Sequence, residues 1–428
     1  MRVVVVGGGV IGLTTAYDLA RAGAEVVVVD ARGVGLGASA VNAGWFVPAE
    51  ATPVPGPKVV AQTVKWMIRR DSPVYIRPSL DPRFVSFLVG MWRHSNARDQ
   101  RAGFEAHLQL ARDTARVLDE YRADGIDFEM HRAGLLMAFA QQENLEHHRA
   151  NLDLVRRFGL DPQVLVGDDV RAHEPLLSDR VHGGIFFPHE RHLDSRALVQ
   201  GLHKRLLELG VRVVENEPAT GVTVTGSRGH RRVTALVTST ALHEGDAFVL
   251  AAGAWTGRLS AAFGHRLPVR PGKGYSIDVP PVPLRGATNL SDAKVAVTPF
   301  SDRLRLAGTM EFAGLDENVN DLRVQAILRA PAVYLRDWEP PAGPLQPRAG
   351  MRPMTPDGLA AIGRLPGTSN AFVSSGHGML GVTLAAGSAR ALTELVVGGV
   401  APPQLAPFDP ARFQLPVHFP ARPRRTRS

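Results

Sequence analysis

The sequence predicts an α/β protein in which a parallel, helix-covered sheet is interleaved with an α+β part built on a mostly antiparallel sheet. Three observations lead to this prediction. Residues 1–30 read as strand, turn, helix and strand, and further strand-like apolar runs return at 248–252 and 371–376. Residues 267–306 alternate between apolar and polar side chains, which is typical of antiparallel strands.

The first unit begins with four consecutive valines at 3–6, as expected of a parallel strand buried on both faces. Gly7, Gly9 and Gly12 follow in the pattern G-x-G-x-x-G, where a tight turn, close pyrophosphate approach and close helix packing each exclude a Cβ atom. Residues 11–22 then place small and apolar side chains at helical spacing. The predicted helix therefore begins at the glycines, where its N-terminus can bind phosphate.

A second valine run ends at Asp30, whose carboxylate can accept hydrogen bonds from a ribose hydroxyl. An acid at this point favours FAD or NAD over NADP. Together the strand, glycines, helix, strand and acid predict a Rossmann-type dinucleotide-binding domain. The alternatives are a similar sheet without a nucleotide, and an Asp30 that is only a solvated acid at a strand end.

Composition excludes several classes of function. The chain has 428 residues, enough for two or three domains, and no cysteine, so disulfides, thiolate metal sites and a cysteinyl flavin link are excluded. The net charge is +8, but the arginines are dispersed apart from a Pro-rich cluster at 422–427, so nucleic-acid binding is not predicted. No metal site is predicted either. With no long apolar run and no leader pattern, we expect a cytoplasmic protein, or one peripheral on the inner face of a membrane.

Two stretches after the first unit attract attention. Residues 31–48 are rich in small side chains, so their backbone can approach a flat ligand closely, with Ser39 and Asn42 at its polar edge. Trp45 within this stretch favours packing over a flexible loop. Residues 58–88 are apolar and aromatic with interspersed arginine and proline, and they predict an access lid, a membrane contact or an ordinary packed excursion.

The remaining elements alternate between the two parts. Asp194 is a predicted N-cap for a helix at 196–210, and the strand ending at 252 leads into Gly253 and Trp255, a second place where the backbone can approach the cofactor. Further expected elements are helices at 84–124, 141–158, 324–335 and 382–397, and strands at 128–140, 211–215 and 221–237. The predicted domains are a discontinuous FAD-binding domain (1–80, 165–260 and 345–400), a substrate-binding domain (81–164 and 261–344) and a C-terminal tail (401–428).

Four segments carry a resemblance to a known family: 7–12 with Asp30, 38–45, 350–358 with 362–363, and 376–381. They resemble the FAD-dependent D-amino-acid dehydrogenase and glycine oxidase group of amine-oxidising flavoproteins, over residues 1–400. Residues 71–78 are most similar to the bacterial D-amino-acid dehydrogenase small-subunit branch.

The resemblance implies FAD as the cofactor and a set of residues that contact it. These are Gly7, Gly9, Val10, Ile11, Gly12, Asp30, Ala31, Arg32, Ser39, Asn42, Ala43, Gly44, Trp45, Gly253, Trp255, Gly378, Met379, Leu380, Gly381 and Thr383. It also implies that Arg352 pairs with the substrate carboxylate, a task for which a planar guanidinium is suited. A structural ion pair with Asp357 is the alternative for Arg352.

The sequence departs from the oxidase pattern at two positions. Ala296 stands where the family has a substrate-binding tyrosine, and Met379 stands where it has a second arginine. Tyr275 is the nearest substitute hydroxyl, with a core tyrosine as the alternative. His377 is expected to shape the pocket near the flavin, with a packed histidine as the alternative.

The function implied is FAD-dependent oxidative deamination of a D-amino acid, or of a cyclic imino acid such as D-proline or hydroxyproline. A hydride leaves the α-carbon for flavin N5, and electrons pass to a quinone or another carrier. The alternatives are a glycine- or sarcosine-type oxidase that makes hydrogen peroxide, a non-catalytic flavin-binding subunit, and a nucleotide-binding regulator whose basic tail contacts nucleic acid.

Overall fold

The computed structural model describes residues 1–57, 73–150, 152–227 and 231–414. Residues 58–72, about half of the predicted lid or membrane segment, and the arginine cluster at 422–427 lie outside these ranges. The description below concerns the described residues.

A six-stranded sheet contains the amino-terminal strand near its middle, in the order β10-β2-β1-β14-β21-β20. The first five strands are parallel, and β20 runs antiparallel to β21. The valines of β1 and β2 face each other in register and are almost fully buried, as their continuous apolar runs predict. The strands are β1 (Arg2–Val6), β2 (Glu25–Val29), β10 (Arg212–Val214), β14 (Ala247–Leu250), β20 (Ala361–Arg364) and β21 (Ala371–Ser375).

Helices cover one face of this sheet, and a small antiparallel sheet covers the other. On the first face lie α1 (Val10–Arg21), α9 (Ser195–Glu208) and α13 (Gly381–Gly398). On the second lie β11 (Ala219–Thr225), β12 (Arg232–Thr238) and β13 (Leu242–Glu244). The doubly covered parallel sheet confirms the predicted Rossmann-type α/β fold.

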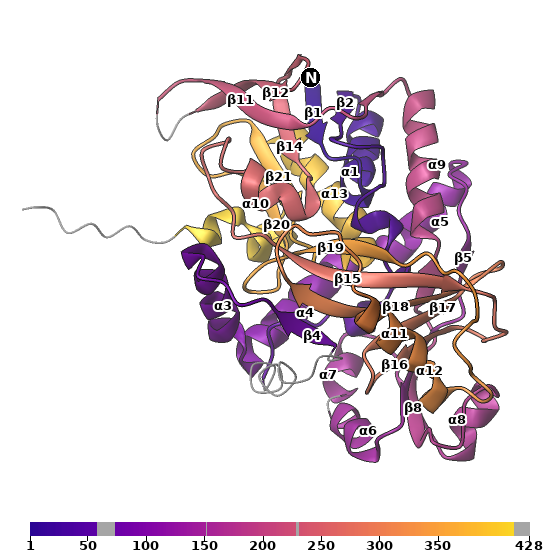
Figure 1. The fold of residues 1–428 in the computed structure, drawn as a ribbon. Helices are drawn as coiled ribbons and strands as arrows, with labels where there is room; N and C mark the ends of the chain where they lie inside the picture. Colours follow the sequence, from indigo (N-terminus) through magenta and orange to yellow (C-terminus); the bar gives the residue numbers. More distant parts are fainter. Residues whose placement is uncertain (58–72, 151, 228–230, 415–428) are drawn as a thin grey trace, which may run out of the picture.

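A nine-stranded, mostly antiparallel sheet forms the second layer, below the first in Figure 1. Its order is β19-β15-β18-β17-β16-β6-β8-β7, with β4 beside β18. The strands are β4 (Val74–Ile76), β6 (Leu135–Phe139), β7 (Gln163–Val166), β8 (Gly183–Phe187), β15 (Arg270–Val279), β16 (Ala287–Leu290), β17 (Val295–Pro299), β18 (Leu304–Phe312) and β19 (Arg348–Met354). Strands β4, β8 and β19 thus join this sheet, although their residues fall in segments assigned from sequence to the FAD-binding domain.

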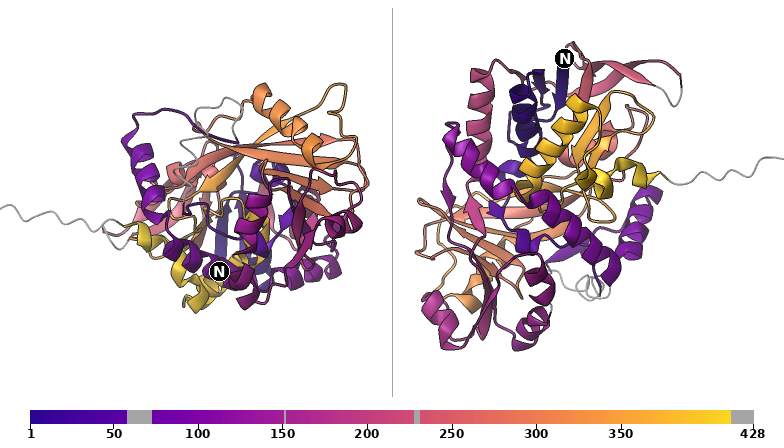
Figure 2. Two further views of the ribbon diagram at one scale, coloured as in Figure 1. Left: turned by 90° about the horizontal axis from the view of Figure 1, so that it is seen from below. Right: turned by 180° about the vertical axis from the view of Figure 1, so that it is seen from behind.

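Smaller elements connect the two layers, as the views in Figure 2 show. A three-stranded sheet joins β3 (Trp45–Phe46), β9 (Arg191–Leu193) and β5 (Met130–His131). The other helices are η1 (Ala38–Ala40), η2 (Pro48–Glu50), α3 (Pro82–His94), α4 (Ala97–Ala111), α5 (Thr114–Ala123), α6 (Gln142–Arg149), α7 (Leu152–Arg157), α8 (Asp168–His173), η3 (Gly253–Trp255), α10 (Thr256–Leu259), α11 (Asp321–Arg329), α12 (Pro331–Tyr334), η4 (Pro403–Phe408) and η5 (Pro410–Phe413).

Three predicted elements are divided in the structure. The helical run at 84–124 forms α3, α4 and α5. Asn96 separates the first two helices, because it caps α4 by accepting a hydrogen bond from the Asp99 amide (3.0 Å), and a second break follows at residues 112–113. The strand at 128–140 is interrupted at Gly134, which has a φ of 74°. The run at 141–158 forms α6 and α7.

Within the described ranges no single helix has the length and hydropathy to cross a membrane. Helix α13 and residues 403–413 meet those criteria only when taken together, and they are bent by 104° relative to each other.

Candidate active site

A cavity of about 1470 Å³ lies between the two large sheets. On one side it is lined by residues at the carboxyl ends of β1, β2, β14 and β21, which is where open parallel sheets bind their ligands. On the other side it is lined by one face of β15, β18 and β19. Its volume exceeds the 300–1,000 Å³ range of ordinary small-molecule sites, so it has room for a dinucleotide and a second ligand.

The turn after β1 has the close contacts that its glycines predict. A Cβ atom on Gly7, which has a φ of 117°, would lie 2.5 Å from the carbonyl oxygen of Ala251. A Cβ atom on Gly12 would overlap the carbonyl oxygen of Gly7, so Gly12 permits helix packing rather than lining the cavity. Asp30 braces the turn, because its carboxylate accepts hydrogen bonds from the amides of Gly8 (2.6 Å) and Arg32 (2.8 Å). A carboxylate has further lone pairs, so Asp30 can still accept from a ribose hydroxyl.

Two helices begin at the cavity wall. Helix α1 begins after Gly9, and the longer helix α13 begins at Gly381, beside which a Cβ atom would meet nothing within 4 Å. The N-terminus of a helix carries partial positive charge and unpaired amides. Both ends therefore offer sites for anionic or electron-rich parts of a ligand.

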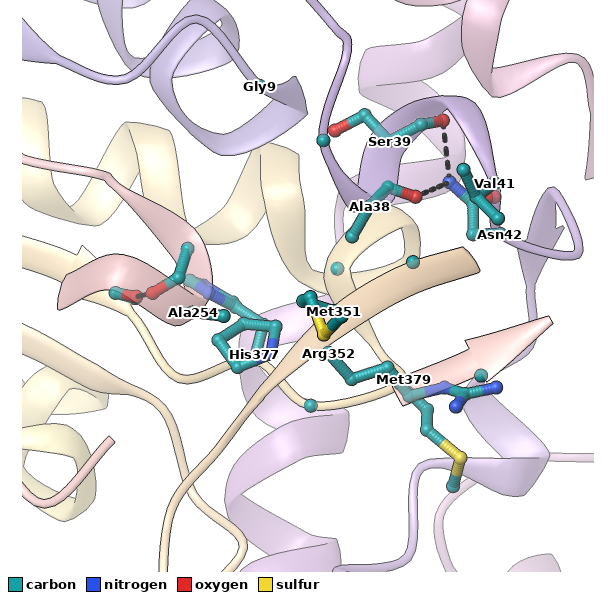
Figure 3. A pocket seen from close by; sticks show the side chains of 18 of the residues that line it. Gly9, Ala38, Ser39, Val41, Asn42, Ala254, Met351, Arg352, His377 and Met379 are labelled. Carbon is teal, nitrogen blue, oxygen red and sulfur yellow. Dashed lines mark hydrogen bonds between the residues drawn. The ribbon is translucent and has the colours of Figure 1, made fainter. Parts of the chain in front are cut away.

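Residues 38–45 form a folded turn against the cavity rather than a free loop (Figure 3). The hydroxyl of Ser39 accepts a hydrogen bond from the Val10 amide (2.9 Å). The Asn42 side chain donates to the Ser39 carbonyl (2.8 Å) and accepts from the Gly44 amide (2.7 Å). These two side chains shape the backbone that lines the cavity.

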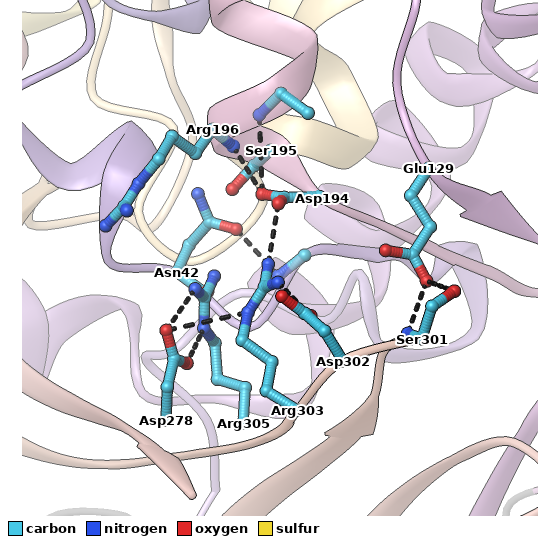
Figure 4. Close-up of polar contacts among 12 residues, drawn as sticks. Asn42, Glu129, Asp194, Ser195, Arg196, Asp278, Ser301, Asp302, Arg303 and Arg305 are labelled. Atoms are coloured by element: carbon cyan, nitrogen blue, oxygen red, sulfur yellow. Dashed lines mark hydrogen bonds and ion pairs between the residues drawn. The ribbon is translucent and has the colours of Figure 1, made fainter. Parts of the chain in front are cut away.

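A polar network attaches this turn to the antiparallel sheet (Figure 4). Arg305 is fully buried on β18 and forms two hydrogen bonds with the carboxylate of Asp278 on β15, at 2.7 and 3.0 Å. It also donates to the Asn42 carbonyl (3.2 Å). Its neighbour Arg303 donates to Asp194, the N-cap of α9 (2.6 Å). The network fixes both layers around the cavity.

Arg352 reaches into the cavity from β19. Its guanidinium crosses β15 over Gly274, where a Cβ atom would overlap it, and donates to the Thr309 carbonyl (2.8 Å). In the described part of the chain no carboxylate pairs with it. The alternative partner, Asp357, instead binds Arg412 (2.7 Å). Burial without an acidic neighbour lowers the pKa of Arg352 to about 10, so a ligand carboxylate is the partner that this cation lacks.

A β-bulge positions the carbonyl that holds Arg352. The register of β15 and β18 shifts between Lys273 and Tyr275, so β18 has one extra residue there. Thr309 lies in this bulge with a φ of 68°, which is an outlier for a β-branched residue. Such strain at a cavity wall is typical of a functional site.

His377 and Ser374 line the cavity near the end of β21. The Nε2 atom of His377 is hydrogen-bonded to Ser388 (3.0 Å), while its Nδ1 atom and the Ser374 hydroxyl are buried with no hydrogen-bond partner in the described ranges. Burial lowers the pKa of His377 to about 3, so this imidazole is neutral at physiological pH.

The structure brings together most of the residues singled out from sequence. Arg352, His377 and all the predicted cofactor residues except Gly12 and Thr383 line the cavity, as does Ala296. Thr383 supports the wall instead, because its hydroxyl accepts from the Val47 amide (3.1 Å). The part of each residue in cofactor or substrate binding remains a prediction.

Tyr275 does not line the cavity. It lies on the opposite face of β15 from Gly274, in the core of the antiparallel sheet, and its hydroxyl donates to Glu311 (3.0 Å). Because alternate residues of a strand face opposite sides, Gly274 and Tyr275 cannot both face the cavity. The position therefore matches the alternative of a core tyrosine.

Sequence reasoning missed several polar lining residues, among them Glu50, Asn289, Lys294 and Thr309. Each comes from a different segment, and none belongs to a recognisable motif. Only the fold brings them to one cavity.

The cavity fits a flavin dinucleotide. It offers a glycine turn that excludes Cβ atoms, two helix N-termini, and the Nδ1 of His377 and hydroxyl of Ser374, which have no partner among the described residues. Fold and site define a dinucleotide-binding protein. Residues 2–395 match the model of the FAD dependent oxidoreductase (DAO) family, so the chain belongs to that family and its cofactor is FAD.

The chain is similar in sequence to proteins named D-amino acid dehydrogenase and similar in fold to solved structures of glycine oxidase. The chain is 34% identical over 410 residues to the D-amino acid dehydrogenase of Bradyrhizobium diazoefficiens, covering 93% of this chain and 95% of the relative. It is 35% identical over 410 residues to that of Cereibacter sphaeroides, covering 93% and 92%. Among solved structures, glycine oxidase from Geobacillus kaustophilus gives a TM-score of 0.76 at 23% identity, covering 97% of this chain and all of the other, which supports the fold.

Proposed function

We propose that this protein is a D-amino-acid dehydrogenase. The observation that carries the proposal is the guanidinium of Arg352, which lies in the FAD-binding cavity without a carboxylate partner among the described residues. An α-amino acid always offers a carboxylate beside the carbon to be oxidised. The relatives named D-amino acid dehydrogenase, at 34–35% identity over most of the chain, support this substrate class.

In this proposal the protein binds and orients the substrate. Arg352 pairs with the substrate carboxylate through two parallel hydrogen bonds, and the Thr309 carbonyl restrains its guanidinium. FAD, when bound, supplies the acceptor for the hydride that leaves the α-carbon. Because the pKa of His377 is about 3, this residue is a poor base, and in this proposal the substrate amine binds unprotonated. Water then hydrolyses the imine, or a ring imine persists if the substrate is a cyclic imino acid such as D-proline.

The electron acceptor is proposed to be a quinone or another carrier. Val85, Val89 and Trp92 of α3 line the cavity and are 47%, 40% and 64% exposed, so an apolar surface lies at its mouth. Such a surface suits contact with an apolar carrier or with the inner face of a membrane. We therefore propose that the protein is cytoplasmic or peripheral on the inner face of the membrane. A glycine- or sarcosine-type oxidase is the second candidate, supported by the fold similarity to glycine oxidases.

The test is anaerobic titration of the purified protein with D-amino acids, cyclic amino acids and N-methyl amino acids, monitored by flavin absorbance. Bleaching by D-amino acids, with little peroxide once air is admitted, is the expected result. Stoichiometric peroxide would instead indicate an oxidase. Failure of every amine to reduce the flavin would leave a non-catalytic flavin-binding subunit.

A further inference from the structure

Glu50 presents a carboxylate to the same cavity as Arg352. One of its oxygens accepts a hydrogen bond from the side-chain amide of Asn289 (2.6 Å). No described residue donates to the other oxygen, and the remaining accessible surface of Glu50 faces the cavity that it lines. A hydrogen-bonding site for a ligand is therefore left open on this side chain.

The turn that carries Glu50 is held from several directions. The Glu50 amide donates to the Val47 carbonyl (3.1 Å), and the Ala49 amide donates to the buried carboxylate of Glu190 (3.1 Å). The ring of His107 donates to the Ala51 carbonyl (2.7 Å). A side chain on such a restrained turn is preorganised for recognition, because little conformational entropy is lost when a ligand binds.

Glu50 and Arg352 are held at opposite sides of the strands β18, β17 and β16, which are neighbours in the antiparallel sheet. Arg352 is anchored at β18 through Thr309, and Asn289, which binds Glu50, lies on β16. Since β17 separates these strands, the two anchor points are two strand spacings apart across the sheet, about 10 Å. Asn289 is level with Ala307, so Thr309 also lies two residues further along β18. The described residues that line the floor between them include the small residues Ala296, Ala307 and Gly308, with Lys294 directly before β17. An extended ligand can therefore lie along this face and touch both ends.

The carboxyl group at the Glu50 end favours a hydrogen-bond donor. Burial raises the pKa of Glu50, and the Asn289 amide and the charge of Lys294 oppose this shift only in part. Lys294 is exposed, and no ion pair joins it to Glu50 within the described ranges. Whether or not Glu50 is ionised, a carboxyl group in this position has an oxygen free to accept a hydrogen bond.

We propose that Glu50, positioned by Asn289, is a specificity-determining residue that selects amino acids whose side chain ends in a hydrogen-bond donor about three carbons from the α-carbon. The inference rests on the proposed function, because it requires the substrate carboxylate to lie on Arg352. The donor is an ammonium or a hydroxyl, and the two are separated by experiment. A terminal methyl group would leave the Glu50 carboxyl without its partner, at a cost in affinity.

The first test measures binding without turnover. Hexanoate, 5-hydroxypentanoate and 5-aminopentanoate carry a methyl group, a hydroxyl or an ammonium at the same distance from the carboxylate. They lack an α-amine, so they bind without being oxidised, and flavin spectral shifts give their dissociation constants. We expect at least one donor-bearing ligand to bind roughly 10- to 100-fold more tightly than hexanoate, and Glu50→Leu to abolish that difference. Glu50→Gln keeps the volume and a carbonyl oxygen, so it should weaken the ammonium ligand more than the hydroxyl ligand. Glu143→Gln, a change of an exposed carboxylate on α6, is the matched control.

The second test compares flavin reduction by D-norleucine, 5-hydroxy-D-norvaline and D-ornithine, with D-alanine as a substrate too short to reach Glu50. Glu50→Leu should lower kcat/KM for the donor-bearing substrates by the same factor as their binding and should lower kcat/KM for D-alanine far less. If the unmodified protein gives all three long ligands the same dissociation constant and kcat/KM, the inference about Glu50 is overturned, while the proposed function stands. If neither hexanoate nor D-alanine interacts with the protein, the proposed function itself fails.

Discussion

Two arginines of the antiparallel sheet, the fully buried Arg305 and the half-buried Arg352, have opposite surroundings. Arg305 is matched by Asp278, with two hydrogen bonds and a third to a backbone carbonyl, and it holds the Asn42 turn against the sheet. Arg352 also donates to a carbonyl, but the described residues provide it with no carboxylate. Arg305 thus stabilises the fold, whereas the guanidinium of Arg352 can still bind a ligand carboxylate.

The difference shows how to separate structural from functional cations in this fold. The carboxylate of Asp278 neutralises the charge of Arg305, so an anionic ligand would gain little binding free energy there. The charge of Arg352 is desolvated without compensation, as its lowered pKa indicates, so an external carboxylate gains most at that point. Substitutions at the two sites should therefore separate stability from activity.

The largest expected effect is on activity. Arg352→Met removes the partner of the substrate carboxylate, so kcat/KM for a D-amino acid should fall by roughly 100- to 1,000-fold, or about 3–4 kcal/mol of transition-state stabilisation. The melting temperature should be unchanged or higher, because an uncompensated buried charge is removed. Stopped-flow flavin reduction and calorimetry measure the two quantities. Unchanged kinetics would remove Arg352 from the site.

Arg305→Met should give the opposite result. It removes both hydrogen bonds to Asp278, leaves that carboxylate with the longer ion pair to Arg303 (3.6 Å), and releases the Asn42 turn, so the free energy of unfolding should fall by about 3 kcal/mol. Denaturant titration measures this loss. The dissociation constant of pentanoate, a shorter unreactive carboxylate, should change far less in the folded protein than in Arg352→Met, and a larger loss there would contradict the division of roles.

Gly274→Ala tests the approach of Arg352 across β15. The added Cβ atom would overlap the guanidinium, whose flexible side chain must then move away from Thr309. We expect carboxylate binding to weaken about tenfold, with a smaller change in stability than in Arg305→Met. Equilibrium binding of pentanoate measures the effect. Gly221→Ala, where a Cβ atom meets nothing within 4 Å, is the control.

The smallest expected effect is that of pH on carboxylate binding. Arg352 stays charged below its pKa of about 10, and His377 stays neutral above its pKa of about 3, so neither changes charge between about pH 6 and pH 9. The dissociation constant of pentanoate should be constant over this range. Reduction by a D-amino acid should instead rise with pH as the substrate amine loses its proton. A break in the pentanoate profile near neutral pH would indicate another titrating group beside Arg352.

Local sequence determined much of this protein. The valine runs, the glycine turn and Asp30 specify a parallel strand pair and its ligand-binding turn, because each depends on contacts within one short segment. The resemblance added Arg352 and His377, which the structure places in the cavity. Apolar periodicity predicts one helix at 84–124 because it continues across Asn96, where the cap geometry divides α3 from α4.

Only the tertiary structure determined which side chains line the cavity and which distant residues contact each other. Strand periodicity leaves open which face of β15 meets the cavity, so Tyr275 could not be distinguished from Gly274 as a lining residue by spacing alone. Asp357 is near Arg352 in sequence, yet its carboxylate binds Arg412, more than fifty residues away. Glu50 and Asn289 meet across 239 positions because two separately formed layers pack together, and no local pattern records such a contact.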